Sequence, residues 1–213
     1  MKLLVSAAYF APVEYFCAAA GFGEVVVEAH ERYRKQSYRS RCEILGANGV
    51  LPLVVPVQRV HGSPPPIRDV RIDYATPWQR QHWRSLRSAY GSSPFYMHYA
   101  DELAPFFFRR EGFLLDLNLS VTRLLLGLVG LCPEVSLTDS YAPSYADALD
   151  FRRCVSPKRS RREERGAFSA AEYYQVFSPR FGFVPNLSIL DLLFNEGPSA
   201  LETLRRSACG GLG

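Results

Sequence analysis

The pair Asn48-Gly49 constrains the fold of this chain more than any other feature of the sequence. Asn-Gly favours a tight hairpin turn because both residues tolerate positive φ angles, and it stands between two strand-like segments, 41–45 and 50–57. Pro52 and Pro56 are an even number of residues apart in the second segment. Their missing N–H groups therefore lie on the same edge of the strand, and the other edge is free to pair. The sequence therefore predicts a β-hairpin whose second strand is an edge or carries a bulge.

The remaining elements follow from hydrophobic periodicity and from turn residues. Strands are expected at 2–8, 24–28, 67–74 and 135–138, and helices at 11–20, 77–90, 94–110, 119–130 and 189–194. The fold class is α/β, with mixed α+β as the alternative: a small mixed sheet with a β-hairpin and a largely helical C-terminal half. We expect a single domain over 1–199 and a flexible C-terminal tail over 200–213.

Local signals set the ends of several of these elements. Ser92-Ser93-Pro94 predicts the start of the helix over 94–110, and Pro105 predicts a kink in it. Asn118 is the expected cap of the buried helix over 119–130. The segment 186–188 is the expected cap of the last helix. The segment 150–165 is basic and lacks apolar periodicity, so an exposed loop is expected there.

Composition limits the class of protein. Of 213 residues, 47% are hydrophobic and the formal net charge is +4, which fits a globular chain and does not by itself indicate a polyanion partner. Five scattered cysteines without a CxxC pair argue against a disulfide framework or a zinc site and favour the cytoplasm. The apolar run 113–131 contains Asp116, Asn118 and Arg123, so a buried helix is favoured over a membrane span.

A run of basic and aromatic residues between the second strand and the hairpin is the principal candidate for a binding site. Arginines hold phosphate or carboxylate in two-pronged hydrogen bonds, lysine adds a point charge, and tyrosine offers a stacking face and a hydroxyl. The candidate ligand-binding residues in this run are Glu31, Tyr33, Arg39 and Arg41, together with Lys35. The alternative is a solvated, charge-rich surface.

His82 is the best single candidate for acid–base chemistry, because histidine titrates near neutrality without help. It shares a helical stripe with Trp78 and therefore points inward, so a core histidine with satisfied hydrogen bonds carries equal weight. Cys42 lies beside the basic run, but packing as a small hydrophobe is favoured over a nucleophilic role. The other histidines have no metal-ligand spacing, and we expect neither a metal nor another cofactor.

The second basic segment, RRCVSPKRSRREER at 152–165, has the charge to bind nucleic acid or anionic lipid. Two glutamates interrupt it, and no aromatic residues lie between its charges. A solvated loop is therefore the favoured interpretation, and a nucleic-acid partner is disfavoured.

Seven segments between Tyr9 and Pro198 have a recognisable order: YFAPVEYF, ERYRKQSYRSRCEILGANG, LVVPV, IRDVRIDY, WQRQHWRSLRSAY, SSPFY and YYQVFSPRFGFVPNLSILDLLFNEGP. Together they resemble the successive blocks of the WbqC-like protein family over nearly the whole chain. The family's Tyr–x–Lys–x–x–x–x–Arg core is similar to Tyr33, Lys35 and, after the spacer, Arg39 or Arg41. Its tryptophan–histidine helix is similar to the segment with Trp78 and His82.

The resemblance implies a role in bacterial surface polysaccharide, such as O-antigen, with transfer of an aminoacyl or acyl group to an amino sugar. It also suggests Tyr9, in the first block, as a ligand-binding residue. Family members commonly have a Gln-Pro or His pair before the Tyr-Phe, and here Ala7-Ala8 stand instead. If that polar residue takes part in the chemistry of the family, the departure puts the activity of this chain in doubt.

Two hypotheses of different classes follow. The preferred one is a cytoplasmic transferase-like enzyme in which His82 and Lys35 are catalytic and a small anionic ligand or nucleotide sugar is the partner. The alternative is a non-catalytic module that binds an anionic small ligand, a glycan or nucleic acid through the same basic run. The sequence leaves the substrate, the reaction and the oligomeric state open.

Overall fold

The structure, a computed structural model, describes residues 1–59, 62–157 and 168–208. Its main sheet has four parallel strands in the order β5-β2-β1-β6. These are β1 (Lys2–Ser6), β2 (Glu24–Glu28), β5 (Glu134–Leu137) and β6 (Ala148–Asp150). The α/β class and three of the strand predictions are confirmed, whereas β6 was not predicted.

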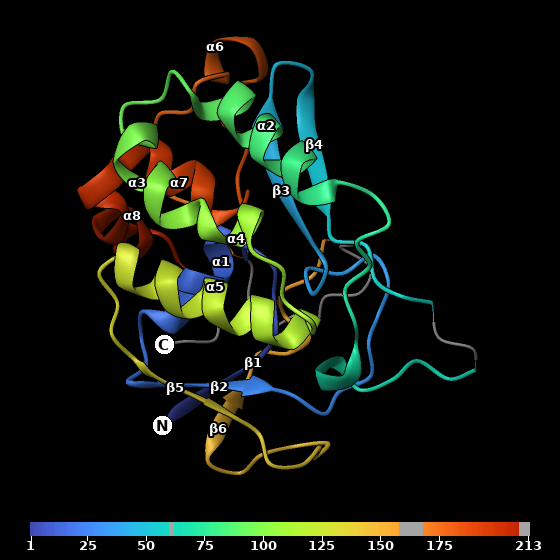
Figure 1. Ribbon diagram of the computed structural model, residues 1–213. Coiled ribbons are helices and arrows are strands. Elements are labelled where there is room, and N and C mark those ends of the chain that lie inside the picture. The colour runs from blue at the N-terminus through green and yellow to red at the C-terminus, as the bar shows by residue number, and fades with distance from the viewer. Residues whose placement is uncertain (60–61, 158–167, 209–213) are drawn as a thin grey trace.

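Helix α1 (Val13–Ala19) joins β1 to β2, as a parallel pair requires. All of its residues are buried, because it lies between the sheet and the C-terminal helices. Figure 1 shows the helices stacked on one side of the sheet, with α1 and α5 nearest to it. The opposite ends of the molecule are therefore the sheet and the helix α2 with the hairpin.

The predicted hairpin is present as β3 (Arg41–Gly46) and β4 (Gly49–Val54). Its turn residues are Ala47 and Asn48. Of the Asn-Gly pair only Gly49 has a positive φ, +103°. Glycine adopts this angle without the steric penalty of a Cβ atom, and the hairpin forms around it.

The outer edge of β4 is the edge that the prolines predicted. Pro52 is paired with Glu43 of β3, and the Glu43 carbonyl accepts a hydrogen bond from the Ser188 N–H at 2.8 Å. The backbone groups of this residue pair therefore point away from the partner strand. The N–H that Pro52 lacks would lie on the outer edge of β4, so the pairing with β3 loses no hydrogen bond.

Two helices of the middle segment agree with the sequence prediction. Helix α2 (Trp78–Tyr90) has the expected bounds, and the predicted kink appears as a break between α3 (Tyr96–Leu103) and α4 (Pro105–Phe108). The predicted serine cap is wrong, because α3 follows Phe95 without a side-chain cap. Ser93 instead donates its hydroxyl hydrogen to the Tyr90 carbonyl at 2.7 Å.

Helix α5 (Leu114–Leu128) begins before the predicted start, and the role predicted for Asn118 is wrong. Asn118 lies inside the helix, and its Nδ2 donates to the Arg39 carbonyl at 2.8 Å. The side chain therefore ties α5 to the loop before β3. Among the described residues, no helix has both the length and the apolar character of a membrane span.

The strand expected at 67–74 is wrong. Ile67–Asp69 form a short 3-10 helix, and beyond it the structure has isolated bridges, Val57 with Ile72 and Arg71 with Phe113. The apolar side chains Ile67 and Val70 are three residues apart, which one helical turn buries together. The alternating residues that predicted one strand therefore lie partly in the 3-10 helix and partly in the isolated bridges.

The exposed loop expected from 150 onward is wrong at its start. Asp150 ends β6, and Phe151 and Arg152 are buried. The strand pairs with β1 over only three residues, too few for a periodic pattern to show. The part of the prediction from 158 to 165 lies outside the described residues.

The C-terminal part contains α6 (Ser178–Phe181), α7 (Ile189–Glu196) and α8 (Ala200–Arg206), with a 3-10 turn at Gly197–Ser199. Ser188 caps α7 as predicted, since its Oγ accepts from the Leu190 N–H at 3.4 Å. Residues 200–206 are not a flexible tail, because Ala200 and Leu204, one helical turn apart, are buried in the core. Residues 209–213 lie outside the described part.

Candidate functional site

A cleft of about 870 Å³ opens beyond the carboxyl ends of β2, β5 and β6. In parallel α/β sheets this edge is where ligands bind, since loops from neighbouring strands meet there. We call it the carboxyl-edge cleft. Its lining residues are His30, Glu31, Arg32, Arg34, Ser37, Arg39, Pro66, Tyr141, Pro143, Arg152, Arg153, Val155 and Ser156.

Glu28, the last residue of β2, supports the floor of this cleft. Its carboxylate is fully buried and accepts hydrogen bonds from the Thr138 hydroxyl at 2.8 Å, the Arg152 guanidinium at 2.9 Å and the His30 backbone N–H at 2.9 Å. A buried carboxylate is stable only when it is paired and hydrogen-bonded. Glu28 therefore fixes residues from three strand ends in one place.

Arg152 follows β6 and is held at both ends of its guanidinium. Nε and Nη2 donate to Asp150, Nη1 to Glu28, and the remaining two hydrogens to the carbonyls of Ala142 at 3.0 Å and Pro143 at 3.2 Å. These bonds use all five donors of an arginine. The hydrogen bonds and charge of Asp150, with that of Glu28, raise the pKa of Arg152. Arg152 thus shapes the cleft wall and has no donor left for a ligand.

Arg39 is the second ordered cation of the cleft. It forms a two-pronged ion pair with Glu31, in which Nε donates at 2.8 Å, and Nη2 also donates to the Ser6 hydroxyl at 2.9 Å. Asn118 fixes its backbone carbonyl from α5. Within the described residues Nη1 of Arg39 has no hydrogen bond, so this group can bind an anion in the cleft.

His30 brings a titratable group to the same cleft. Its Nε2 lies 3.0 Å from the Thr138 carbonyl oxygen. A carbonyl oxygen only accepts hydrogen bonds, so the hydrogen is assigned to Nε2, and Nδ1 carries the lone pair of the neutral ring. No described residue is hydrogen-bonded to Nδ1. The ring is therefore held by one nitrogen and has the other available as a base.

Three further arginines add positive charge to the cleft. Arg32, Arg34 and Arg153 are exposed, and Arg32 donates to the Pro64 carbonyl at 2.9 Å. No described acidic side chain is paired with Arg34. Phosphate oxygens are the natural partners of such side chains, so the cleft suits a phosphorylated or otherwise anionic ligand.

A small recess adjoins the inner wall of the cleft and shares Arg39, Arg152 and Val155 with it. Ala7 and Ala8, at the end of β1, line this recess. The pair in which the sequence departs from the common family form therefore lies next to the cleft. Its methyl groups give this chain an apolar surface there.

The structure brings two of the predicted ligand-binding residues into the cleft, Glu31 and Arg39. Tyr33, Lys35 and Arg41 are not among the lining residues. The Tyr33 hydroxyl is hydrogen-bonded to the Ser40 hydroxyl at 2.8 Å, Arg41 is paired with Glu43, and Lys35 is exposed. The basic run therefore faces in more than one direction.

The other predicted site residues form a separate cluster, the Tyr9–His82 core, made of Tyr9, Trp78 and His82. All three are buried, and the Tyr9 hydroxyl lies 3.0 Å from His82 Nδ1. The ring also has a hydrogen bond with the Val54 backbone. Burial lowers the pKa of His82 to about 4. His82 is thus a neutral core histidine bonded to Tyr9 and to the hairpin, and it is not among the residues that line the cleft.

Cys42 lies beside this core and is also buried. Burial raises the pKa of its thiol, an effect that outweighs the nearby Arg41. The thiol is therefore protonated and packs as a small hydrophobe, as the sequence favoured.

The residues that sequence reasoning missed are His30, Glu28 and Arg152. Their common signal is position: each lies at or within two residues of the carboxyl end of a parallel strand. His30 and Glu28 could have been found by this rule, because β2 was predicted with the correct bounds. Arg152 could not, since β6 was not recognised.

The sequence belongs to a known protein family. The chain is a member of the WbqC-like protein family, whose sequence pattern matches residues 7–159, a range that contains every residue lining the cleft. It is also 30% identical over 222 residues to the uncharacterised protein Rv1507c of Mycobacterium tuberculosis (strain ATCC 25618 / H37Rv), with 90% of this chain and 91% of that protein covered. No solved structure matches the chain.

Proposed function

We propose that the protein is a transferase-like enzyme that binds a nucleotide-activated amino sugar in the carboxyl-edge cleft. It would transfer an aminoacyl or acyl group to the sugar amine in the biosynthesis of a bacterial surface polysaccharide of the O-antigen type. The family supports the biological setting, and the cleft supports the ligand class. A cytoplasmic location fits the scattered cysteines of the sequence, which show no disulfide pattern.

The volume and charge of the cleft support an anionic ligand of this size. Ligand sites commonly have volumes of roughly 300–1,000 Å³, and this cleft has about 870 Å³. Arg34 and the Nη1 group of Arg39 would bind the phosphates, because guanidinium groups match phosphate geometry. Arg152 would hold the wall in place without touching the ligand.

His30 would act as the general base of the transfer. Its Nδ1 would take the proton from the attacking amine as the new bond to the acyl carbon forms and the donor's leaving group departs. The Thr138 carbonyl would fix the ring and stabilise the protonated form through Nε2–H. The single observation that carries the proposal is that His30 and the cations share one cleft.

The catalytic roles of His82 and Lys35 stay predictions. His82 would need a ligand to reach the Tyr9–His82 core, whose three side chains are buried and do not line the cleft. Lys35 is exposed and lies outside the cleft lining.

The test has two stages, binding and turnover. Calorimetry with nucleoside diphosphates and with their amino sugars should show binding, and mass spectrometry with aminoacyl and acyl donors should show transfer. His30→Ala should lower kcat about 10²- to 10⁴-fold, the usual contribution of a general base, with little change in KM. His98→Ala, at an exposed histidine on α3, is the matched control.

The outcomes separate the two hypotheses. Binding without transfer from any donor would favour a non-catalytic module that uses the same cleft. Transfer that survives His30→Ala unchanged would refute the assignment of the base.

A further inference from the structure

A second surface, remote from the cleft lining, combines arginines with exposed aromatic and apolar side chains. Helix α2 exposes Arg80, Arg84 and Arg87 along one side, at spacings of four and three residues, and contains no acidic residue. The end of α4 adds the exposed residues Phe108 and Arg109. We call this surface the α2–α4 face.

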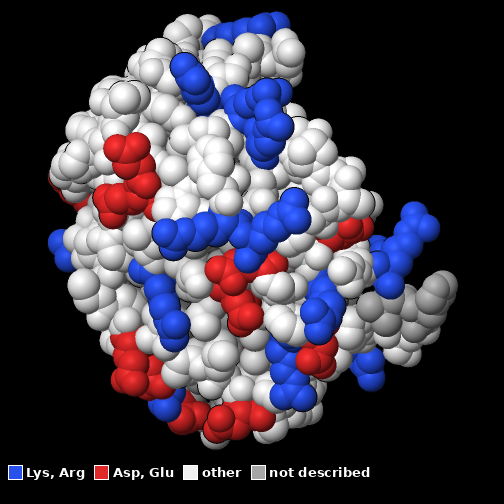
Figure 2. All heavy atoms as spheres, in the orientation of Figure 1, with Lys and Arg blue, Asp and Glu red and all other residues white. Residues whose placement is uncertain are grey.

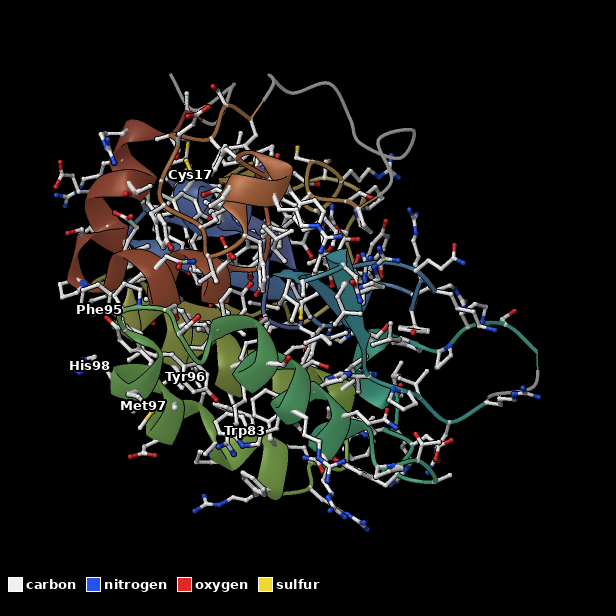
Figure 3. The ribbon with its side chains drawn as sticks, turned by 90° about the horizontal axis from the view of Figure 1, so that it is seen from above. Cys17, Trp83, Phe95, Tyr96, Met97 and His98 are labelled. Carbon is white, nitrogen blue, oxygen red and sulfur yellow. The ribbon has the colours of Figure 1, made fainter. Side chains whose placement is uncertain are left out.

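Aromatic contacts make the α2–α4 face one continuous surface. The half-buried Trp83 ring packs edge-on against Phe108, with 5.9 Å between the ring centroids, and lies 5.3 Å from the Phe107 ring and 6.4 Å from Tyr96. Gln79 adds hydrogen bonds from α2 to the carbonyls of Phe106 and Arg109. Figure 3 shows Trp83, Tyr96 and Met97 along one side of the molecule.

The exposed apolar side chains of this side are large. Met97 is 78% exposed and Phe108 is 65% exposed, which makes them, after Met1, the most exposed large hydrophobic residues of the described part of the chain. Trp83 lies between α3 and α4. A single exposed apolar residue is ordinary, but Phe108 packed on Trp83 beside a row of arginines forms a surface of defined chemistry.

The charge of the face is not neutralised within the protein. No described acidic side chain is paired with Arg80, Arg84 or Arg87. Figure 2 shows basic side chains across the region of α2 and α4, and acidic side chains beyond it, over α3 and α5. A partner of this face must therefore be anionic and must accept apolar side chains.

We propose that the α2–α4 face binds the surface of an anionic lipid bilayer. Phe108 would enter the boundary between headgroups and acyl chains, Trp83 would lie at the interface, and the arginines would bind lipid phosphates. Long arginine side chains suit this position because their apolar stems cover hydrophobic surface while their charges stay in water.

Two other occupants fit less well. A second copy of the chain would bring two rows of arginines together across a two-fold axis, and like charges repel. Single-stranded nucleic acid needs serial ring faces on which bases stack, whereas Phe108 offers one exposed ring whose edge contact with Trp83 fixes its orientation.

The test is flotation of the full chain with vesicles of phosphatidylcholine alone and of phosphatidylcholine and phosphatidylglycerol in equal parts. The protein should float with the anionic vesicles and not with the neutral ones, and added salt should weaken binding. The double variant R84E and R87E should lower the affinity about tenfold or more, since each basic residue near an anionic surface contributes substantially.

Matched variants keep the outcome decisive. The double variant R205E and R206E reverses two exposed charges on α8, which packs on α1 and α7, and should bind as the wild type does. Phe108→Ala changes an exposed side chain, so the fold is kept, and it should weaken binding several-fold without altering the salt dependence.

Three results would overturn the proposal. These are equal flotation with neutral vesicles, equal loss in the α2 and α8 variants, and binding to a single-stranded RNA homopolymer in place of the vesicles. The proposal does not depend on the cleft, so ligand binding in the α2 variant should be unchanged.

Discussion

The carboxyl-edge cleft and the Tyr9–His82 core each contain a histidine held by hydrogen bonds, and they differ in what those bonds leave open. His30 has a hydrogen bond through Nε2 alone among the described residues, and its ring lines a cleft. The His82 ring is hydrogen-bonded to Tyr9 and to the Val54 backbone and is buried. Access of one unpartnered nitrogen to a ligand, rather than the residue type, separates a candidate base from a structural histidine.

The same contrast holds for the charged groups around them. In the cleft, the buried ion pair of Glu28 and Arg152 has its hydrogen bonds satisfied within the protein and forms a scaffold. Exposed charged side chains such as Arg34 form the outer layer. The Tyr9–His82 core has no ion pair among its three side chains; Tyr9, His82 and the hairpin are joined by hydrogen bonds, and the buried Trp78 Nε1 has no hydrogen-bond partner among the described residues. The scaffold of the cleft should therefore govern stability, and its outer layer should govern binding.

The largest effect is expected from Glu28→Ala. Removal of the carboxylate leaves the buried Arg152 without one of its two charged partners, and breaking a buried pair costs about 3–5 kcal/mol of unfolding free energy. Urea denaturation measures it. Glu24→Ala breaks the exposed pair with Lys2 and should cost less than about 1 kcal/mol. Similar losses in the two variants would show that Glu28 is not a scaffold residue.

His82→Ala should rank second. The variant loses a buried ring that packs on Trp78 and Tyr9, and core truncations of this kind cost about 2–4 kcal/mol. His30→Ala, at the cleft, should change the unfolding free energy by less than about 1 kcal/mol. Reversal of this order in urea denaturation would break the comparison between the two histidines.

The pH dependence of stability should come from the Tyr9–His82 core. The folded pKa of His82 is about 4, below its ordinary value of 6.5. As pH falls, His82 therefore binds a proton in the unfolded chain before it does so in the folded protein. The free energy of unfolding decreases between the unfolded pKa and the folded pKa of His82. Between pH 7 and pH 5 the expected loss is about 2 kcal/mol. His82→Phe should remove this part of the slope in urea titrations, and an unchanged slope would show that other groups cause it.

The smallest effect is expected from Arg34→Ala in the outer layer of the cleft. One phosphate-binding arginine contributes about 1.4 kcal/mol, so the affinity for a nucleoside diphosphate should fall roughly tenfold. The unfolding free energy should stay within about 0.5 kcal/mol of the wild type. Arg180→Ala, at an exposed arginine on α6, serves as the control in calorimetry. Equal affinities of the two variants would remove Arg34 from the site.

The sequence predicts well those features that local chemistry decides. The hairpin around Gly49, helix α2 and the Ser188 cap depend on residues within one or two turns of the chain, and all three are confirmed. The predicted strand β2 also has the observed bounds, because three consecutive valines leave few alternatives.

Features that depend on distant partners were missed for a physical reason. The three residues of β6 become a strand only because β1 supplies hydrogen bonds. Asn118 has the chemistry of a cap, yet its partner is the Arg39 carbonyl, 79 positions away. The sequence around Arg152 indicates a basic loop, whereas the fold brings Glu28 and Asp150 beside its guanidinium. The candidate site is mostly of this second kind, so Glu31 and Arg39 were found and its scaffold was not.

The proline on the outer edge of β4 has a consequence for the behaviour of the protein at high concentration. Val50 and Val54 of this strand are each 50% exposed, and an apolar, unpaired strand edge is a template for aggregation. A strand from another chain that docked there would find no N–H at Pro52, so its ladder would be interrupted at the centre. The molecule can therefore expose this apolar strand to solvent while its edge resists conversion into a fibril.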